Sequence, residues 1–185
     1  LLEPSVEVTL EANPGTFESK KFEAFRDAGV NRLSIGVQSF NAEQLLKLGR
    51  IHNDAEARHA IETSQRYFKN INLDLLYALP NQTIEQAQAD IETACATGVS
   101  HISAYHLTLE PNTLFYQCPP QLPDDELSAD MQALIEQTLK NSGFARYEIS
   151  AFAHSGHRSR HNLNYWKFGD YLGIGAGAHS KISFR

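Results

Sequence analysis

The sequence predicts an α/β fold in which parallel strands alternate with helices, most simply as a (β/α) barrel with an open or wet interior. Three observations support this prediction. Short β-rich runs alternate with helical patterns, three of those helical patterns end at a glycine, and the expected strands are apolar on one face and polar on the other.

The strands and helices follow one another in a regular order. Five β-rich runs are expected, at residues 6–12, 32–38, 71–78, 101–107 and 147–150. Helical patterns lie between them, at 16–28, at 42–67 with a break near Gly49, at 83–97 and at 124–142. Gly29, Gly98 and Gly143 follow three of these helices, where glycine supplies a left-handed cap. Crossovers of this length join parallel strands.

The faces of the strands favour a barrel. In the first strand Val6, Val8 and Leu10 share one side, and Glu7, Thr9 and Glu11 share the other. The next two strands alternate in the same way, so one side packs under helices and the other carries small and polar groups. An open Rossmann-type sheet also fits, although no G-x-G-x-x-G follows the first strand. An antiparallel sheet with one solvent-facing side is the remaining alternative.

Composition narrows the class of protein further. The 185 residues are 42% hydrophobic and 21% charged, which is ordinary for a globular chain. No run is long and apolar enough for a membrane span, and two cysteines cannot form a cysteine-ligated cluster. The chain begins at Leu1 and its single methionine is Met131, so we expect it to be a fragment or a processed chain.

Charge is distributed unevenly along the chain, whose net charge is −6. Residues 1–139 hold 9 Lys or Arg against 20 Asp or Glu, whereas residues 140–185 hold 7 against 2. We therefore expect a barrel portion at 1–143 and a basic C-terminal extension at 144–185 that meets an anion. Nucleic acid is a poor candidate partner, because the whole chain is acidic and carries no nucleic-acid-binding motif.

Polar side chains lie at the predicted carboxyl ends of three strands. Glu11, Gln38 and Asp74 fall there on the polar side, and Arg50 follows Gly49 in a loop. That rim carries the site in barrel enzymes. Two carboxylates and an amide can hold the hydroxyls, amine and adenine edge of a nucleoside-like ligand. A helix cap or a surface ion pair is the alternative role for each residue taken alone.

Several ordered motifs resemble one family. They are EANP at 11–14, LSIGVQSF at 33–40, LGR at 48–50, LDLLYALPNQ at 73–82 and HLTLEP at 106–111. This series resembles the radical S-adenosylmethionine (SAM) proteins related to oxygen-independent coproporphyrinogen III oxidase, whose fold is a partial (β/α) barrel. The resemblance implies that Glu11, Gln38, Arg50 and Asp74 contact S-adenosylmethionine, with Thr108 a weaker fifth match. It also implies a [4Fe–4S] cluster on a C-x-x-x-C-x-x-C loop, which we expect before Leu1.

The C-terminal extension resembles the haem chaperone branch of that family. The segments HNLNYW at 161–166 and YLGIGAGAHS at 171–180 match this branch. The resemblance implies haem binding, with His161 as the candidate iron ligand and Arg160 and Tyr165 close by. Imidazole is a common iron ligand, and an arginine can pair with propionates. A helix-capping or core hydrogen-bonding role is the alternative for His161.

The predicted function is therefore that of a cytoplasmic haem chaperone, which passes haem or a related tetrapyrrole to an acceptor protein. Coproporphyrinogen dehydrogenase, an enzyme, is the alternative within the family. The resemblance therefore leaves open whether the protein is an enzyme. A non-redox (β/α) barrel that binds a small anion is the alternative from another class.

Overall fold

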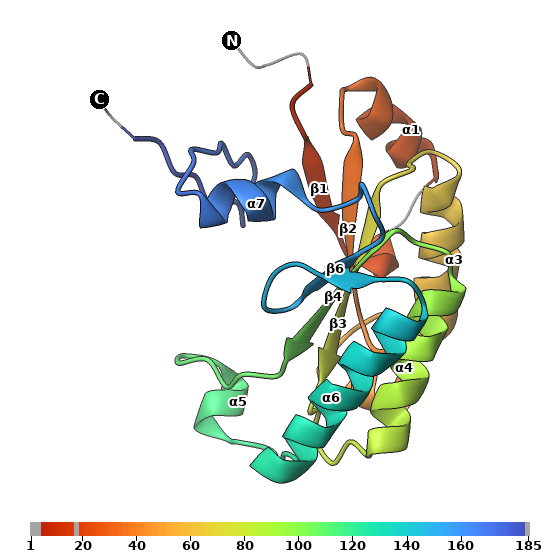
Figure 1. The fold of residues 1–185 in the computed structure, drawn as a ribbon, viewed down its shortest axis with the longest axis vertical. Helices are drawn as coiled ribbons and strands as arrows, with labels where there is room; N and C mark the ends of the chain where they lie inside the picture. The colour runs from red at the N-terminus through yellow and green to blue at the C-terminus, as the bar shows by residue number, and fades with distance from the viewer. Residues whose placement is uncertain (1–4, 17–18, 184–185) are drawn as a thin grey trace.

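One six-stranded sheet organises the computed structural model, which describes residues 5–16 and 19–183 (Figure 1). The strand order is β1-β2-β3-β4-β6-β5. The strands are β1 (Thr9–Ala12), β2 (Arg32–Gln38), β3 (Ile71–Tyr77), β4 (His101–His106), β5 (Ala145–Arg146) and β6 (Ala151–Ala153). Strands β1 to β4 are mutually parallel, whereas β6 runs antiparallel to both β4 and β5. The predicted α/β class with parallel strands is confirmed, and the antiparallel alternative is excluded for β1 to β4.

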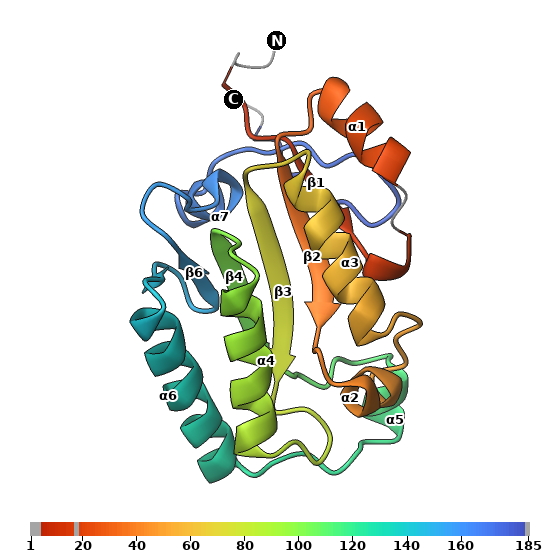
Figure 2. The same cartoon turned by 90° about the vertical axis from the view of Figure 1, so that its right-hand side faces the viewer.

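The helices lie mainly over one face of this sheet, as Figure 2 shows. Those that follow the parallel strands are α1 (Ser19–Asp27), α2 (Ala42–Lys47), α3 (Asp54–Gln65) and α4 (Ile84–Ala96). Helix α6 (Asp125–Asn141) packs beside α4, and the short elements are η1 (Pro14–Thr16), α5 (Leu114–Gln117) and α7 (Arg160–Trp166). Helix α7 lies on the other side of the sheet from α3, α4 and α6 (Figure 1). No helix in residues 5–16 and 19–183 is long and apolar enough to cross a membrane.

Local sequence signals set where the helices begin and end. Asn53 and Thr83 each form a capping box at the start of α3 and α4, so both satisfy amide groups that the helix leaves unpaired. The predicted break near Gly49 is confirmed, since α2 ends there with Gly49 at φ +66°. At that angle glycine carries no steric penalty.

The core lies between the sheet and its covering helices. The apolar faces of the central strands are fully buried there, as the period-two pattern predicts. The strand residues include Leu33, Ile35, Leu73, Leu75 and Ile102, and the helix residues include Ala57, Ile61, Ile91, Met131 and Ile135. The opposite side of the sheet, which carries Ser34, Asn72, Asp74, His101 and Ser103, is called the polar face below.

The prediction of a fifth strand at 147–150 is wrong. Residues 147–150 form the turn between β5 and β6, and the buried run Ala151–Ala153 pairs with β4 instead. Phe152 is only 4% exposed, so burying this ring in the core determines which short run becomes the strand. The first strand is also shorter than predicted, because its pairing with β2 begins at Thr9.

Candidate functional site

The polar face aligns side chains from four strands at one level. Register places Glu11 opposite Ser34, Ser34 opposite Asn72, and Asn72 opposite His101. Ser34, Asn72 and His101 are buried, whereas Glu11 is exposed. Parallel pairing therefore brings together residues that are up to ninety positions apart in the chain.

Asp74 is held in place by two neighbours on this face. Its Oδ2 accepts a hydrogen bond from Ser34 Oγ at 2.7 Å, and its Oδ1 accepts one from Asn72 Nδ2 at 2.8 Å. Burial raises the pKa of the Asp74 carboxyl, because a charged group loses hydration there. The two hydrogen bonds and the nearby charge of Arg32 oppose this shift, and the charge of Glu11 adds to it. The two carboxylates are thus close enough for the charge of Glu11 to affect the ionisation of Asp74.

Gln38 folds back over the same face at the end of β2. Its backbone has a φ of +68°, and the pairing with β3 is irregular between Ile35 and Gln38. A Cβ built on Gly36 would lie 2.9 Å from Gln38 Nε2 and 3.2 Å from Asn13 Oδ1. Glycine at this position therefore leaves space for two polar side chains beside Asp74's strand. The sequence prediction that Glu11, Gln38 and Asp74 share one side of the sheet agrees with this arrangement.

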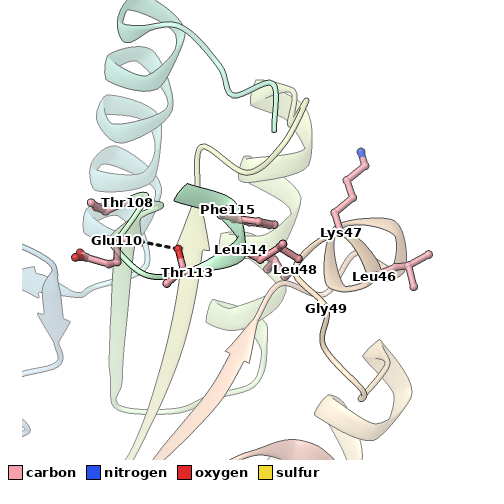
Figure 3. A pocket seen from close by; sticks show the side chains of 9 residues that line it. All are labelled: Leu46, Lys47, Leu48, Gly49, Thr108, Glu110, Thr113, Leu114 and Phe115. Carbon is pink, nitrogen blue, oxygen red and sulfur yellow. Dashed lines mark hydrogen bonds between the residues drawn. The ribbon is translucent and has the colours of Figure 1, made fainter. Parts of the chain in front are cut away.

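The other two predicted residues come from loops, since Arg50 follows α2 and Thr108 follows β4. Thr108 is one of nine residues lining a cavity of about 350 Å³, shown in Figure 3. The others are Leu46, Lys47, Leu48, Gly49, Glu110, Thr113, Leu114 and Phe115. Arg50 follows Gly49 directly and is exposed, and its backbone N–H donates to Leu45 O at 2.9 Å. This cavity lies between α2 and the segment leading to α5, and its lining is largely apolar.

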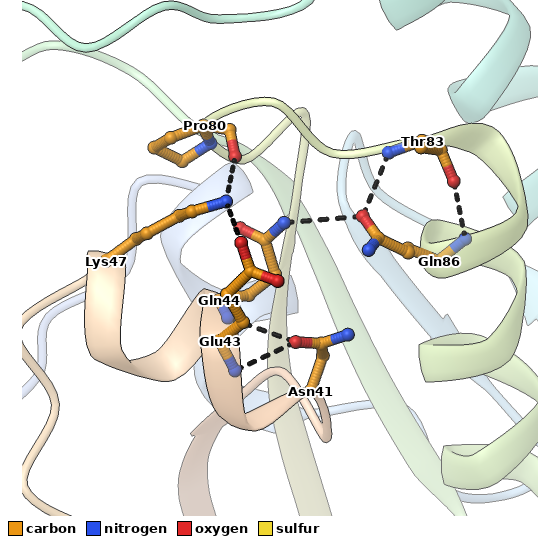
Figure 4. A network of polar contacts seen from close by, with 7 residues as sticks. All are labelled: Asn41, Glu43, Gln44, Lys47, Pro80, Thr83 and Gln86. Atoms are coloured by element: carbon orange, nitrogen blue, oxygen red, sulfur yellow. Dashed lines mark hydrogen bonds and ion pairs between the residues drawn. The ribbon is translucent and has the colours of Figure 1, made fainter.

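A hydrogen-bonded network joins the loops that follow β2 and β3 (Figure 4). Lys47 Nζ donates to Pro80 O at 3.3 Å and pairs with Glu43 at 2.8 Å. Gln44 Nε2 donates to Gln86 Oε1 at 3.4 Å, which connects α2 to the first turn of α4. Both loops leave the carboxyl ends of their strands. The network therefore stabilises the edge of the sheet at which Gln38 lies.

The predicted haem residues all lie on α7. Ser159 caps this helix, and Glu7 accepts the backbone N–H groups of Arg160 and His161, each at 3.2 Å. The Arg160 guanidinium donates to Ser5 O at 2.6 Å. Helix α7 is thereby tied to the segment that precedes β1, toward the amino ends of the strands (Figures 1 and 2). Of the predicted S-adenosylmethionine residues, Gln38 lies at the opposite, carboxyl end of its strand.

His161 presents its ring to solvent. The side chain is exposed, and its ring meets Tyr171 edge to face at 4.8 Å between centroids. Among the described residues, no hydrogen bond joins either imidazole nitrogen to another group. Tyr165 is 56% exposed and meets Trp166 edge to face. The structure therefore gives His161 neither the helix-capping nor the core role of the alternative interpretation.

Sequence reasoning missed the contribution of Tyr147 and His101. The sequence predicts only a strand at Tyr147, yet its hydroxyl contacts His101 Nε2 at 2.7 Å and also two groups at the start of α7. Period-two alternation places His101 on the polar face with Ser103, which is the one signal that pointed to this residue. Nothing local in the sequence indicated Tyr147.

The chain is similar in sequence to proteins of one superfamily. The Radical SAM superfamily profile matches residues 2–94. The chain is 50% identical over 183 residues to "Heme chaperone HemW" of Haemophilus influenzae, covering 98% of this chain and 48% of the relative. It is 48% identical over 184 residues to "Heme chaperone HemW" of Escherichia coli, covering 99% and 49%. The chain thus spans about half the length of these relatives.

A bovine protein and a solved bacterial structure also resemble this chain. A protein of Bos taurus, "Radical S-adenosyl methionine domain-containing protein 1, mitochondrial", is 39% identical over 181 residues, covering 95% of this chain and 41% of the relative. Coproporphyrinogen III oxidase (HemN) from Escherichia coli superposes with a TM-score of 0.78 at 23% identity, covering 94% of this chain and 44% of that one. This superposition shows the shared fold. With half of its length matched by the superfamily profile, the chain belongs to the Radical SAM superfamily.

Proposed function

We propose that this chain supplies the S-adenosylmethionine-contacting surface and the haem-binding segment of a haem chaperone. The observation that carries the proposal is α7, where the motif H-N-x-x-Y-W presents an unpaired imidazole beside exposed aromatic rings. Identities of 48–50% to proteins named heme chaperones, over nearly the whole chain, support it.

The chemistry of the polar face fits S-adenosylmethionine. The exposed Glu11 and the half-buried Asp74 are carboxylates that accept hydrogen bonds from hydroxyl and ammonium groups. The side-chain amide of Gln38 can both donate and accept, and the missing Cβ of Gly36 leaves it room to approach a ligand. In this superfamily S-adenosylmethionine supplies the radical chemistry when bound. The role of these residues is to bind and orient it, with Arg50 and Thr108 approaching from the loops.

The residues present do not fit a [4Fe–4S] cluster. The chain has two cysteines, Cys95 in α4 and the exposed Cys118 after α5, whereas such a cluster needs at least three thiolates. We propose that the ligands of the cluster come from outside this sequence.

The α7 segment fits haem as a cargo. The His161 imidazole nitrogens are free to ligate iron, and the exposed rings of Tyr165 and Trp166 offer apolar area to a macrocycle. Arg160 provides a cation for a propionate. Because all these groups are at the surface, an acceptor protein could reach the haem directly, which a chaperone requires. A cytoplasmic location stays a prediction.

Haem titration of the full-length protein tests this function. We expect His161→Ala to lower haem affinity at least tenfold and to shift the absorbance maximum, because an axial ligand is lost. Arg160→Ala should have a smaller effect, since an exposed ion pair contributes at most about 1 kcal/mol.

His59→Ala is the matched control, because His59 is also exposed but lies on α3 across the sheet. Unchanged haem affinity and spectrum in a folded His161→Ala protein would refute the assignment.

A further inference from the structure

The hydroxyl of Tyr147 joins three parts of the molecule. It lies 2.7 Å from His101 Nε2, 3.1 Å from the backbone N of Ser159 and 3.2 Å from Asn162 Nδ2. Ser159 is the N-cap of α7, and Asn162 is the second residue of the H-N-x-x-Y-W motif. A residue in the turn between β5 and β6 thus contacts both the polar face and the haem segment.

The donors and acceptors define one direction along this chain of contacts. The Ser159 backbone N–H and the Asn162 amide nitrogen can only donate, so the Tyr147 hydroxyl accepts from both. The Tyr147 hydroxyl therefore donates its own hydrogen bond to His101 Nε2. His101 is fully buried, and burial lowers its pKa to about 3, so the ring is neutral.

The neutral ring must then carry its proton on Nδ1, which donates to Asn72 Oδ1 at 2.6 Å. The Asn72 amide nitrogen donates in turn to Ser34 Oγ at 2.7 Å and Asp74 Oδ1 at 2.8 Å. The series of hydrogen bonds therefore runs from the start of α7 to the carboxylate of Asp74. Each buried group in it has a partner, which favours a single arrangement over several.

Helix α7 depends on such contacts for its position. It has seven residues, which is too short for a helix to be stable without tertiary contacts. Its backbone is anchored by Glu7, which lies in the segment before β1, and by Tyr147. Ser159 is 1% exposed, so its N–H would lose its partner without gaining water if the Tyr147 hydroxyl were removed.

We propose that Tyr147 is a positioning residue for haem binding: its hydroxyl, backed by His101 and Asn72, holds α7 on the polar face so that His161 is presented in one orientation. This inference rests on the proposed function. It assigns Asn162 of the motif the role of donating a hydrogen bond to the Tyr147 hydroxyl. Tyr147 itself does not touch the haem.

Tyr147→Phe is the sharpest test, because it removes only the hydroxyl. The ring keeps its contact with the His101 ring and with Arg158, whose guanidinium carbon lies 5.6 Å from the ring centroid. In the haem-free full-length protein we expect amide hydrogen exchange in residues 159–166 to accelerate at least tenfold, while α3 and α4 stay protected. Haem affinity should fall about tenfold with a broadened or shifted absorbance maximum. S-Adenosylmethionine affinity should change less than twofold, since Asp74 keeps both of its hydrogen bonds.

Two variants complete the experiment. Tyr116→Phe, on the exposed face of α5, is the matched control and should change none of these measurements. Asn162→Ala removes one donor to the same hydroxyl from the surface side, so it should reproduce the loss of α7 protection even if Tyr147→Phe folds poorly.

The outcomes separate this inference from the proposed function. Normal exchange of α7 in Tyr147→Phe, or faster exchange with unchanged haem affinity, would overturn the positioning role. In either case a loss of haem binding in His161→Ala would leave the chaperone assignment intact. Unchanged haem binding in His161→Ala, with α7 loosened by Tyr147→Phe, would instead overturn the proposed function.

Discussion

Substituting Gly36 with alanine tests whether Gln38 belongs to the S-adenosylmethionine site. The new Cβ would lie 2.9 Å from Gln38 Nε2 and 3.2 Å from Asn13 Oδ1, and real Cβ atoms essentially never approach another heavy atom closer than 3.0 Å. At least the Gln38 side chain must therefore move. Both obstacles are the ends of side chains and Gly36 does not have a positive φ, so the strand itself can remain in place.

The size of the effect follows from what is displaced. If Gln38 makes one or two hydrogen bonds to the ligand, their loss costs about 1–3 kcal/mol, which raises the Kd roughly 5- to 150-fold. The effect on folding should be smaller. Alanine restricts the unfolded chain and so adds about 0.4–1 kcal/mol of stability, which offsets the cost of moving the amide.

Calorimetric titration of S-adenosylmethionine into the cluster-loaded full-length protein, with a denaturation curve on the same preparation, measures both quantities. Gly15→Ala is the matched control, because its Cβ would meet its nearest neighbours at an ordinary 3.7 Å. Wild-type affinity in a folded Gly36→Ala protein would show that Gln38 makes no contact with the ligand. A large loss of stability would show that the strand cannot accommodate the methyl group.

Two further predictions concern stability. Burial raises the pKa of Asp74 in the folded protein above its ordinary 3.8, so protonation of Asp74 favours folding. The stability of the wild type relative to Asp74→Asn should therefore be greatest below pH 3.8, and it should fall as the pH rises through the raised pKa. Urea denaturation of both proteins across this range measures the difference, and a difference independent of pH would contradict the reasoning. Phe152→Ala should lower the free energy of unfolding by about 3–5 kcal/mol, since its ring is 4% exposed in the core. The surface change Ile174→Ala, at 88% exposure, should stay within about 0.5 kcal/mol in the same assay, and an equal loss in both would refute the placement of Phe152.

Much of the fold could be predicted because its signals are local. Gly29, Gly98 and Gly143 all adopt the positive φ expected of a glycine that ends a helix. Period-two alternation correctly separated the core side of β2 and β3 from the polar face. The strand β6 was missed because three residues carry too little periodicity, and its pairing with β4 joins segments about fifty residues apart.

The sequence by itself determined the chemical types at the candidate site: carboxylates and amides near the strand ends, and the imidazole, aromatic and guanidinium groups of residues 160–166. Only the tertiary structure decided which of them meet. Parallel register brings Ser34, Asn72 and His101 to one level, and the turn after β5 brings Tyr147 to His101, 46 positions earlier in the chain. Such pairings depend on how crossovers and hairpins return the chain to the sheet, and no local pattern of residues encodes a contact between segments so far apart in the sequence.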